Sequence, residues 1–104
     1  MLGYISVVKQ QVKEGMTEEY VALVKGFGIE GIKGARRREF IEVDEHNFIL
    51  IFEYDDISSV IEAQETLVSQ LDQIRHLLVE IDDEGNVTDP ASGTLIYREQ
   101  RAEA

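Results

Sequence analysis

A chain of 104 residues, 43% of them hydrophobic, is long enough to bury one core and too short for two, so we expect residues 1–104 to form a single domain. It contains no cysteine, which excludes disulfides, thiolate nucleophiles and cysteine-held metal or iron–sulfur sites. The formal net charge of -11 repels nucleic acid phosphates and anionic lipid headgroups, so neither a nucleic acid nor a membrane is an expected partner.

The first residues, MLGYISVVKQQVKEG, contain no basic leader followed by an apolar block. No apolar run reaches the length of about eighteen residues that a membrane-spanning helix needs. Together with the absence of cysteine, these features predict a cytoplasmic protein.

Residues 2–12 are rich in β-branched and aromatic side chains and predict a first strand. Thr17 is then placed to cap an amphipathic helix, whose apolar residues recur at spacings of three and four: Tyr20, Leu23, Val24 and Phe27. Glycines at 26, 28, 31 and 34 make further helix costly, at about 1 kcal/mol each relative to alanine. We expect the helix to end there through a glycine in the left-handed conformation.

Residues 35–44 and 47–54 predict two more strands, joined by a short turn at Glu45 and His46. A second amphipathic helix begins near Asp56 or Ser59, where Ser59 and Glu62 have the spacing of a capping box. The pattern allows one long helix or two short ones with a break near Ser69. Turn-forming residues follow at 82–86 and 89–90, a last strand is expected over 93–99, and a frayed tail over 100–104.

The predicted order, β-α-β-β-α-β, is that of the α+β class with a ferredoxin-like fold. The segment from Phe48 to Phe52 has no polar alternation, so both faces of that strand are expected to leave water. Helices on one side of a sheet cover only one of its faces. We therefore expect a homodimer in which a second copy packs against the uncovered sheet face.

The stretch GFGIEG, residues 26–31, matches the glycine pattern of dinucleotide-binding loops. Such a loop works when it follows a strand and opens a helix, whose positive N-terminus then faces the pyrophosphate. Here the order is reversed, because the glycines follow a helix and precede a strand. The nearest helix end is the negative C-terminus, so we interpret these glycines as a helix stop.

A site for a protein-held metal is not predicted either. The chain has two histidines, and no His-x-x-x-His or Glu-x-x-His pair occurs on a predicted helix. His76 falls on the side of the second helix opposite its apolar stripe and is expected to be exposed.

The only basic cluster is Arg36-Arg37-Arg38. In a strand, Arg36 and Arg38 would share a face with Phe40, whereas Arg37 would share the other face with Ile41. These arginines either pair with surrounding acids or, in the case of Arg37 or Arg38, hold an acidic or phenolate group of a ligand.

The whole chain resembles the antibiotic biosynthesis monooxygenase domain of the dimeric α+β barrel superfamily. Three local matches carry the resemblance: a first strand running into Val12-Lys13-Glu14-Gly15 and a helix with Glu18-Glu19-Tyr20, a Gly34-Ala35 entry into the second strand, and the run from Asn47 to Asp56 before the next helix. The resemblance implies a homodimer whose sheets pack into a barrel. It also implies, for some members, oxidation of aromatic polyketides with no metal or flavin cofactor, since the deprotonated substrate itself supplies electrons to oxygen.

Other members of that family degrade haem using a histidine, an asparagine and a tryptophan. This chain has no tryptophan. The position after Glu53, commonly tryptophan in the family, is Tyr54, and no histidine stands near Gln64. These departures argue against haem degradation.

By resemblance, Asn47 and Tyr54 are the expected catalytic residues, because they map onto the family's third-strand motif. Tyr20 and Arg37 are added from residue type alone as substrate-binding candidates. The resulting hypothesis is a cofactor-independent monooxygenase acting on a small aromatic or phenolic, polyketide-like or quinol-like substrate. The alternatives are a non-catalytic homodimeric module for small-molecule binding or assembly, and an isomerase or decarboxylase of the same barrel type.

Overall fold

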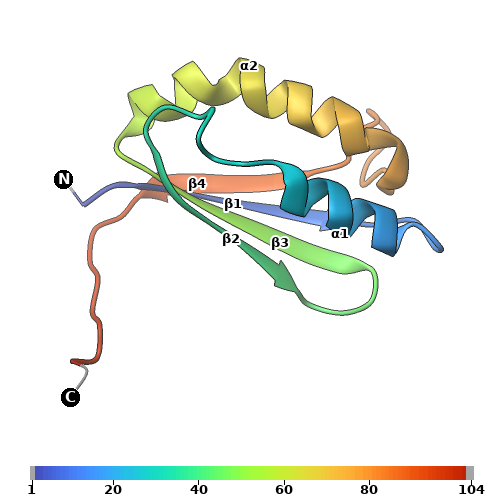
Figure 1. Cartoon of the computed structure of the whole chain (residues 1–104), viewed down its shortest axis with the longest axis horizontal. Helices are drawn as coiled ribbons and strands as arrows, with labels where there is room; N and C mark the ends of the chain where they lie inside the picture. Colours follow the sequence, from blue (N-terminus) through green and yellow to red (C-terminus); the bar gives the residue numbers. More distant parts are fainter. Residues whose placement is uncertain (1, 103–104) are drawn as a thin grey trace.

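The computed structural model describes residues 2–102 as one antiparallel sheet with two helices (Figure 1). The sheet order is β2-β3-β1-β4, and the strands are β1 (Tyr4–Gln11), β2 (Ala35–Glu42), β3 (Asn47–Tyr54) and β4 (Asp89–Thr94). The helices are α1 (Thr17–Gly26) and α2 (Ile57–Ile74), the latter continued by a 3₁₀ turn, η1 (Arg75–Leu77). This is the ferredoxin-like arrangement that the sequence predicts, and the prediction is confirmed.

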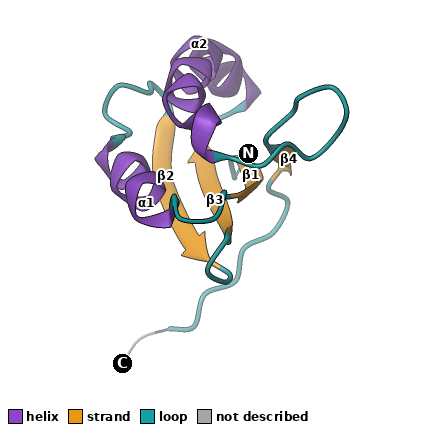
Figure 2. Ribbon diagram, turned by 90° about the vertical axis from the view of Figure 1, so that its right-hand side faces the viewer, coloured by secondary structure: helices purple, strands orange, loops and turns teal. Residues whose placement is uncertain are grey.

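Both helices lie on the same face of the sheet (Figure 2). Strand register assigns the even-numbered residues of the strands, apart from Arg36 at a bulge in β2, to that face in rows that cross the sheet. One row consists of Arg38, Phe52, Ser6 and Ser92, and the next of Phe40, Leu50, Val8 and Pro90. A residue on one strand therefore shares its face with the partners directly opposite it.

Aromatic rings form the core beneath α1. The ring of Tyr20 lies 5.0 Å from that of Phe48 and 5.7 Å from that of Phe40, in tilted arrangements that suit aromatic pairs. From α2, Ala63 and Ile74 are buried against the sheet, and Leu67 and Leu71 pack at the edge of the same cluster. Each fully buried apolar side chain of this size contributes about 1.5–3 kcal/mol to stability, so the helices are held mainly by this one face.

The opposite, helix-free face of the sheet is also largely apolar. Its central residues come from the odd-numbered positions of the strands: Ile5, Val7, Ile41, Ile49, Ile51 and Ala91. Ile41 is 40% exposed, and the four from β1 and β3 are half-buried. The expectation that both faces of the third strand are apolar is confirmed for Phe48 to Phe52. We call this surface the open face.

The last strand differs from its prediction. β4 runs over Asp89–Thr94 instead of 93–99, so Asp89 and Pro90 begin a strand and do not form a turn. The reason lies in β1, which offers partners only as far as Tyr4, opposite Thr94, with one more bond from the Leu95 amide to the Gly3 carbonyl. Beyond that point the chain leaves the sheet (Figure 1). Proline is tolerated because β4 is an edge strand.

Residues 95–102 form no regular element. The predicted frayed tail, 100–104, falls partly outside the described residues, which end at 102.

The helix ends also differ from their predictions. Thr17 is the first residue of α1 and does not cap it; its hydroxyl donates instead to the Glu45 carbonyl at 3.0 Å. No left-handed glycine ends α1, since Phe27 follows in an extended conformation. α2 is one uninterrupted helix, capped by Asp56, whose carboxylate accepts from the Ser59 amide at 3.0 Å, so the predicted capping box is wrong.

Gly34 is the glycine of this region that the fold requires. It has φ +84°, and a Cβ added there would overlap the Ser59 hydroxyl in the first turn of α2. The close approach joins the start of β2 to the start of α2. Gly31 has neither constraint, because nothing lies within 4 Å of a Cβ built on it.

We predict that Gly34→Ala destabilises the protein by about 2 kcal/mol or more, because it combines left-handed strain with overpacking. Urea denaturation measures the loss. Gly31→Ala is the matched control and should change the free energy of unfolding by less than about 0.5 kcal/mol. Equal stability of the two variants would contradict this account.

Candidate functional site

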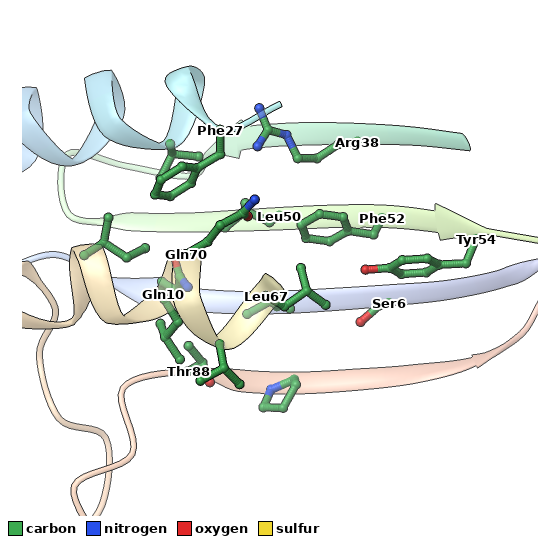
Figure 3. A pocket seen from close by; sticks show the side chains of 16 residues that line it. Ser6, Gln10, Phe27, Arg38, Leu50, Phe52, Tyr54, Leu67, Gln70 and Thr88 are labelled. Carbon is green, nitrogen blue, oxygen red and sulfur yellow. The ribbon is translucent and has the colours of Figure 1, made fainter. Parts of the chain in front are cut away.

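A cavity of about 190 Å³ lies between the sheet and the two helices and is partly open to solvent (Figure 3). Its walls are mostly apolar, formed by side chains such as Phe27, Phe52, Leu67 and Leu71. Six polar side chains line it as well: Ser6, Gln10, Arg38, Tyr54, Gln70 and Thr88. An apolar pocket with a few convergent polar groups is the usual form of a small-molecule site.

Tyr54 closes one end of the cavity. It stands at the end of β3, its ring stacks on Phe52 at 5.9 Å, and its side chain is fully buried. Figure 3 shows its hydroxyl pointing into the cavity. This hydroxyl has no hydrogen-bond partner within residues 2–102. A buried polar group without a partner costs about 1–3 kcal/mol, which a ligand atom could recover.

Burial raises the pKa of Tyr54 to about 12. The phenol is therefore neutral at physiological pH and able to donate a hydrogen bond. It is a poor general base, because ionising it in this environment is unfavourable. Its chemical capability is to stabilise an oxygen that carries negative charge.

Arg38 lies on the neighbouring strand β2, in the same cross-sheet row as Phe52. It is half-buried, and its side chain lines the same cavity as that of Phe27 (Figure 3). None of the residues lining the cavity is acidic, and within residues 2–102 Arg38 forms no ion pair with another residue. The only formal charge on the cavity wall is thus positive.

Tyr20, an expected substrate-binding residue, lies in the core next to the cavity and does not line it. Its hydroxyl donates a hydrogen bond to the Gln10 side-chain carbonyl, and burial raises its pKa. Gln10 itself does line the cavity. Tyr20 is therefore positioned to orient Gln10.

Asn47, an expected catalytic residue, lies at the hairpin between β2 and β3, outside the cavity. Its side-chain amide donates to both carboxylate oxygens of Asp44, at 2.9 and 3.0 Å. The Asp44 carboxylate also accepts from the backbone amides of His46 and Asn47. These bonds, that of His46 first, lower the pKa of Asp44 and fix the turn.

Arg37, the other expected substrate-binding residue, lies on the open face. Its guanidinium contacts Glu53 at 3.0 Å and Glu39 at 3.5 Å. The structure therefore brings Tyr54 to the cavity and places Asn47, Tyr20 and Arg37 elsewhere. Sequence alternation had grouped Arg38 with Phe40, but it could not indicate which face the helices cover.

Glu53, which the sequence did not single out, lies at the centre of a group of ion pairs. Its side chain is only 6% exposed and is surrounded by three arginines, with Arg36 at 3.4 Å, Arg37 at 3.0 Å and Arg98 from the chain after β4. A bulge between Ala35 and Arg37 breaks the strand alternation, so Arg36 reaches Glu53 and Asp55 instead of sharing a face with Phe40. An acidic residue opposite the arginine cluster in a hairpin was the signal available in the sequence.

These arginines, and first of all the hydrogen bond from Arg98, lower the pKa of Glu53. The carboxylate therefore stays ionised at a lower pH than an unpaired glutamate would, and it ties the chain beyond β4 to β3. We call Glu53 with Arg36, Arg37 and Arg98 the Glu53 cluster.

Within residues 2–102, no three metal-ligating side chains lie close enough together to hold a metal ion. No helix in this range combines the length and hydrophobicity needed to span a bilayer.

Comparison with known proteins shows similarity in structure only. No protein-family model matches the sequence, and no curated protein matches it. A protein of Nitrosomonas europaea assigned by name to the antibiotic biosynthesis monooxygenases superposes with a TM-score of 0.77 at 17% identity, covering 92% of each chain. The fold is that of the antibiotic biosynthesis monooxygenase domain.

Two further structures are similar in fold. A variant of SnoaB, a cofactor-independent oxygenase from Streptomyces nogalater, superposes with a TM-score of 0.74 at 12% identity, covering 94% of this chain and 97% of its own. A dimeric ferredoxin-like protein from an uncultured marine organism gives 0.74 at 14% identity, covering 98% and 95%. At these identities the similarity establishes the fold and leaves activity to be argued from the site.

The lowered pKa of Glu53 makes a prediction about acid stability. A carboxylate whose pKa is lower in the folded protein contributes stability above its unfolded pKa, about 4.3 for Glu, and loses it as the pH falls through the folded value. We expect Glu53→Gln to cost about 1 kcal/mol at pH 7, since the arginines are partly exposed, and to flatten the loss of stability below about pH 4.3. Denaturation at a series of pH values measures both.

Asp44 and Asp82 keep their own lowered pKa values in that variant, so some acid sensitivity should remain. Glu65→Gln, at an exposed position of α2, is the control and should leave the pH profile as in the unmodified protein. A profile for Glu53→Gln as steep as that of the control would refute this role for the cluster.

Proposed function

We propose that this chain is a cofactor-independent monooxygenase that oxidises a small phenolic substrate in the cavity between sheet and helices. The observation that carries the proposal is the buried Tyr54 hydroxyl, which lacks a partner within residues 2–102 and points into an apolar cavity. A largely apolar site that offers a fixed donor suits a reaction in which the substrate oxygen becomes negatively charged. SnoaB, a cofactor-independent oxygenase with a similar fold, supports this type of reaction.

In this reaction the bound phenol loses its proton, and the ring carbon made electron-rich by the phenolate gives electrons to molecular oxygen. One oxygen atom ends on that carbon as a carbonyl. The other leaves as water with the two hydrogens lost from carbon and from the phenol, so a phenol and O₂ yield a quinone and H₂O. Tyr54 donates a hydrogen bond to the phenolate oxygen, and the apolar walls hold the ring.

A non-catalytic small-molecule-binding module is the second candidate, and one observation favours it. The lining of the cavity contains no histidine, aspartate or glutamate, so no side chain there takes a proton near neutral pH. In the monooxygenase the substrate proton must instead pass to water through the open side of the cavity. Both candidates need the cavity. The buried side chains of Phe48 and Phe52 do not fill it, and Phe52 forms part of its wall.

We also infer that the chain works as a homodimer joined through the open face. The half-buried isoleucines and valine at its centre, Ile5, Val7, Ile49 and Ile51, form a contiguous apolar surface on neighbouring strands. Surfaces of this kind usually mark an interface. The fold shared with a dimeric ferredoxin-like protein supports a second copy as the partner.

For the reaction, we predict that purified, metal-stripped protein consumes oxygen with single-ring phenols and releases the corresponding quinone together with water. Tyr54→Phe should reduce kcat/KM about 10- to 100-fold while the melting temperature stays the same or rises, because it removes a transition-state donor and an unsatisfied buried hydroxyl together. Asn47→Ala, at the hairpin, is the comparison and should retain turnover. Oxygen uptake by Tyr54→Phe equal to that of the unmodified protein would remove Tyr54 from the mechanism, and no uptake by any form would favour the binding module.

For the dimer, we predict that Ile51→Arg yields a folded monomer, because it places a charge at the centre of the apolar surface. Light scattering gives the mass, and circular dichroism verifies the fold. Ile61→Arg, at an exposed position of α2, is the control and should leave the mass at twice that of the chain. A monomeric unmodified protein, or an unchanged mass for Ile51→Arg, counts against the open face as the interface.

A further inference from the structure

Of the six arginines of this chain, Arg38 and Arg101 form no ion pair within residues 2–102, and Arg101 lies exposed in the segment after β4. Arg36, Arg37, Arg75 and Arg98 each form an ion pair with a carboxylate. Within residues 2–102, Arg38 pairs with none, although the sequence has 21 acidic residues against 10 basic ones. An arginine kept from carboxylates in so acidic a chain, and half-buried at a cavity, has a guanidinium available to an incoming anion.

The size of the cavity limits what that anion can be. A dry apolar cavity of about 150 Å³ accommodates one benzene ring, and the volume here is about 190 Å³. The space therefore holds one ring with a small substituent. A fused three-ring body would not be enclosed without movement of α1 or α2.

The polar groups are also arranged for a ligand with one charged end. Arg38 stands on β2, and Tyr54 lies two residues along β3 from Phe52, the residue opposite Arg38. Phe52 from the sheet lies between them, and Phe27 from the chain after α1 and Leu67 from α2 add further apolar wall (Figure 3). A ring lying on these side chains would present an oxygen substituent to the guanidinium or to the phenol.

We propose that the cavity selects single-ring aromatic oxyanions, with the negative charge held by Arg38 and a hydrogen bond donated by Tyr54. This inference rests on the cavity of the proposed function and names the substrate class for it. Arg38 is then the specificity-determining residue, because a neutral ring of the same shape leaves its guanidinium without a partner. For a phenol, the same charge favours the ionised form in which electrons pass to oxygen.

Calorimetric titration of the full chain with benzoate and with benzamide tests the selection, because the two probes have nearly the same shape and differ in charge. We expect saturable binding of benzoate, at least about tenfold tighter than benzamide, and weaker at high salt. Arg38→Gln should lower benzoate affinity about 10- to 100-fold and leave benzamide affinity within about twofold. Arg75→Gln removes the same charge from an exposed ion pair at the end of α2 and should bind benzoate as the unmodified protein does.

Para-nitrophenol provides a spectroscopic readout, since its phenolate absorbs visible light. At a fixed pH near the titration midpoint of free para-nitrophenol, the unmodified protein should increase the fraction of the dye present as phenolate. The Arg38→Gln variant should not. A purely structural role for Arg38 predicts equal phenolate fractions with both proteins, and comparison of their melting temperatures separates loss of folding from loss of binding.

Three results would overturn the proposal: no saturable benzoate binding, benzamide binding as tightly as benzoate, or unchanged benzoate affinity in folded Arg38→Gln. These readouts need no turnover, so they fail separately from the proposed function. Arg38-dependent benzoate binding without oxygen uptake would keep the anion site and reject the monooxygenase. Oxygen uptake that Arg38→Gln leaves intact would keep the monooxygenase and reject the anion site.

Discussion

The pairing of β1 with β3 is the constraint on which the rest of the structure depends. These two strands occupy the centre of the sheet, and their register decides which side chains of both edge strands face the helices. A shift of one residue would turn Phe52 and Tyr54 away from α2 and bring Ile51 and Glu53 toward it. The core, the cavity and the Glu53 cluster all follow from this single alignment, because each consists of residues that the alignment assigns to the same face.

The same alignment explains why neighbouring residues on one strand have unrelated surroundings. Arg37 and Arg38 are adjacent in sequence, yet Arg37 is held by carboxylates on the open face and Arg38 faces the cavity. Glu53 and Tyr54 differ in the same way. The chain thus separates a charged, paired region from an apolar region with unpaired polar groups by the thickness of one sheet. That separation lets a strongly acidic protein keep a positively charged wall on its cavity.

Much of the fold could be read from local pattern. The bounds of the third strand, 47–54, agree with the prediction. The helical spacing of Val60, Ala63, Leu67, Leu71, Ile74 and Leu78 likewise predicts one apolar stripe, and all six belong to the core or pack against it. β4 could not be placed in this way, because its extent depends on where β1 runs out of partners, which is a contact between the two ends of the chain. The caps at Thr17 and Ser59 were misplaced because several polar residues near each helix start satisfy the same rule.

The candidate site was less accessible to sequence reasoning. Arg38 shares its face with Phe40, and Arg37 shares the other with Ile41, so hydrophobic pattern alone gives both arginines an apolar neighbour and does not distinguish the covered face. Tyr54 was selected from its position in the third-strand motif, and its lack of a partner is visible only in three dimensions. The Glu53 cluster needed both the bulge near Arg36 and the return of Arg98, neither of which has a local signature.

The contact between Arg98 and Glu53 has a consequence for any shortened or extended form of this chain. The last strand ends at Thr94, so a truncation after that residue would leave all four strands in the chain. It would also remove one of the three cations around a carboxylate that is almost inaccessible to water, and leave Arg36 and Arg37 to compensate alone. The functional boundary of the domain therefore lies beyond its last strand, at Arg98 or later, and a purification tag or fusion partner belongs after that residue.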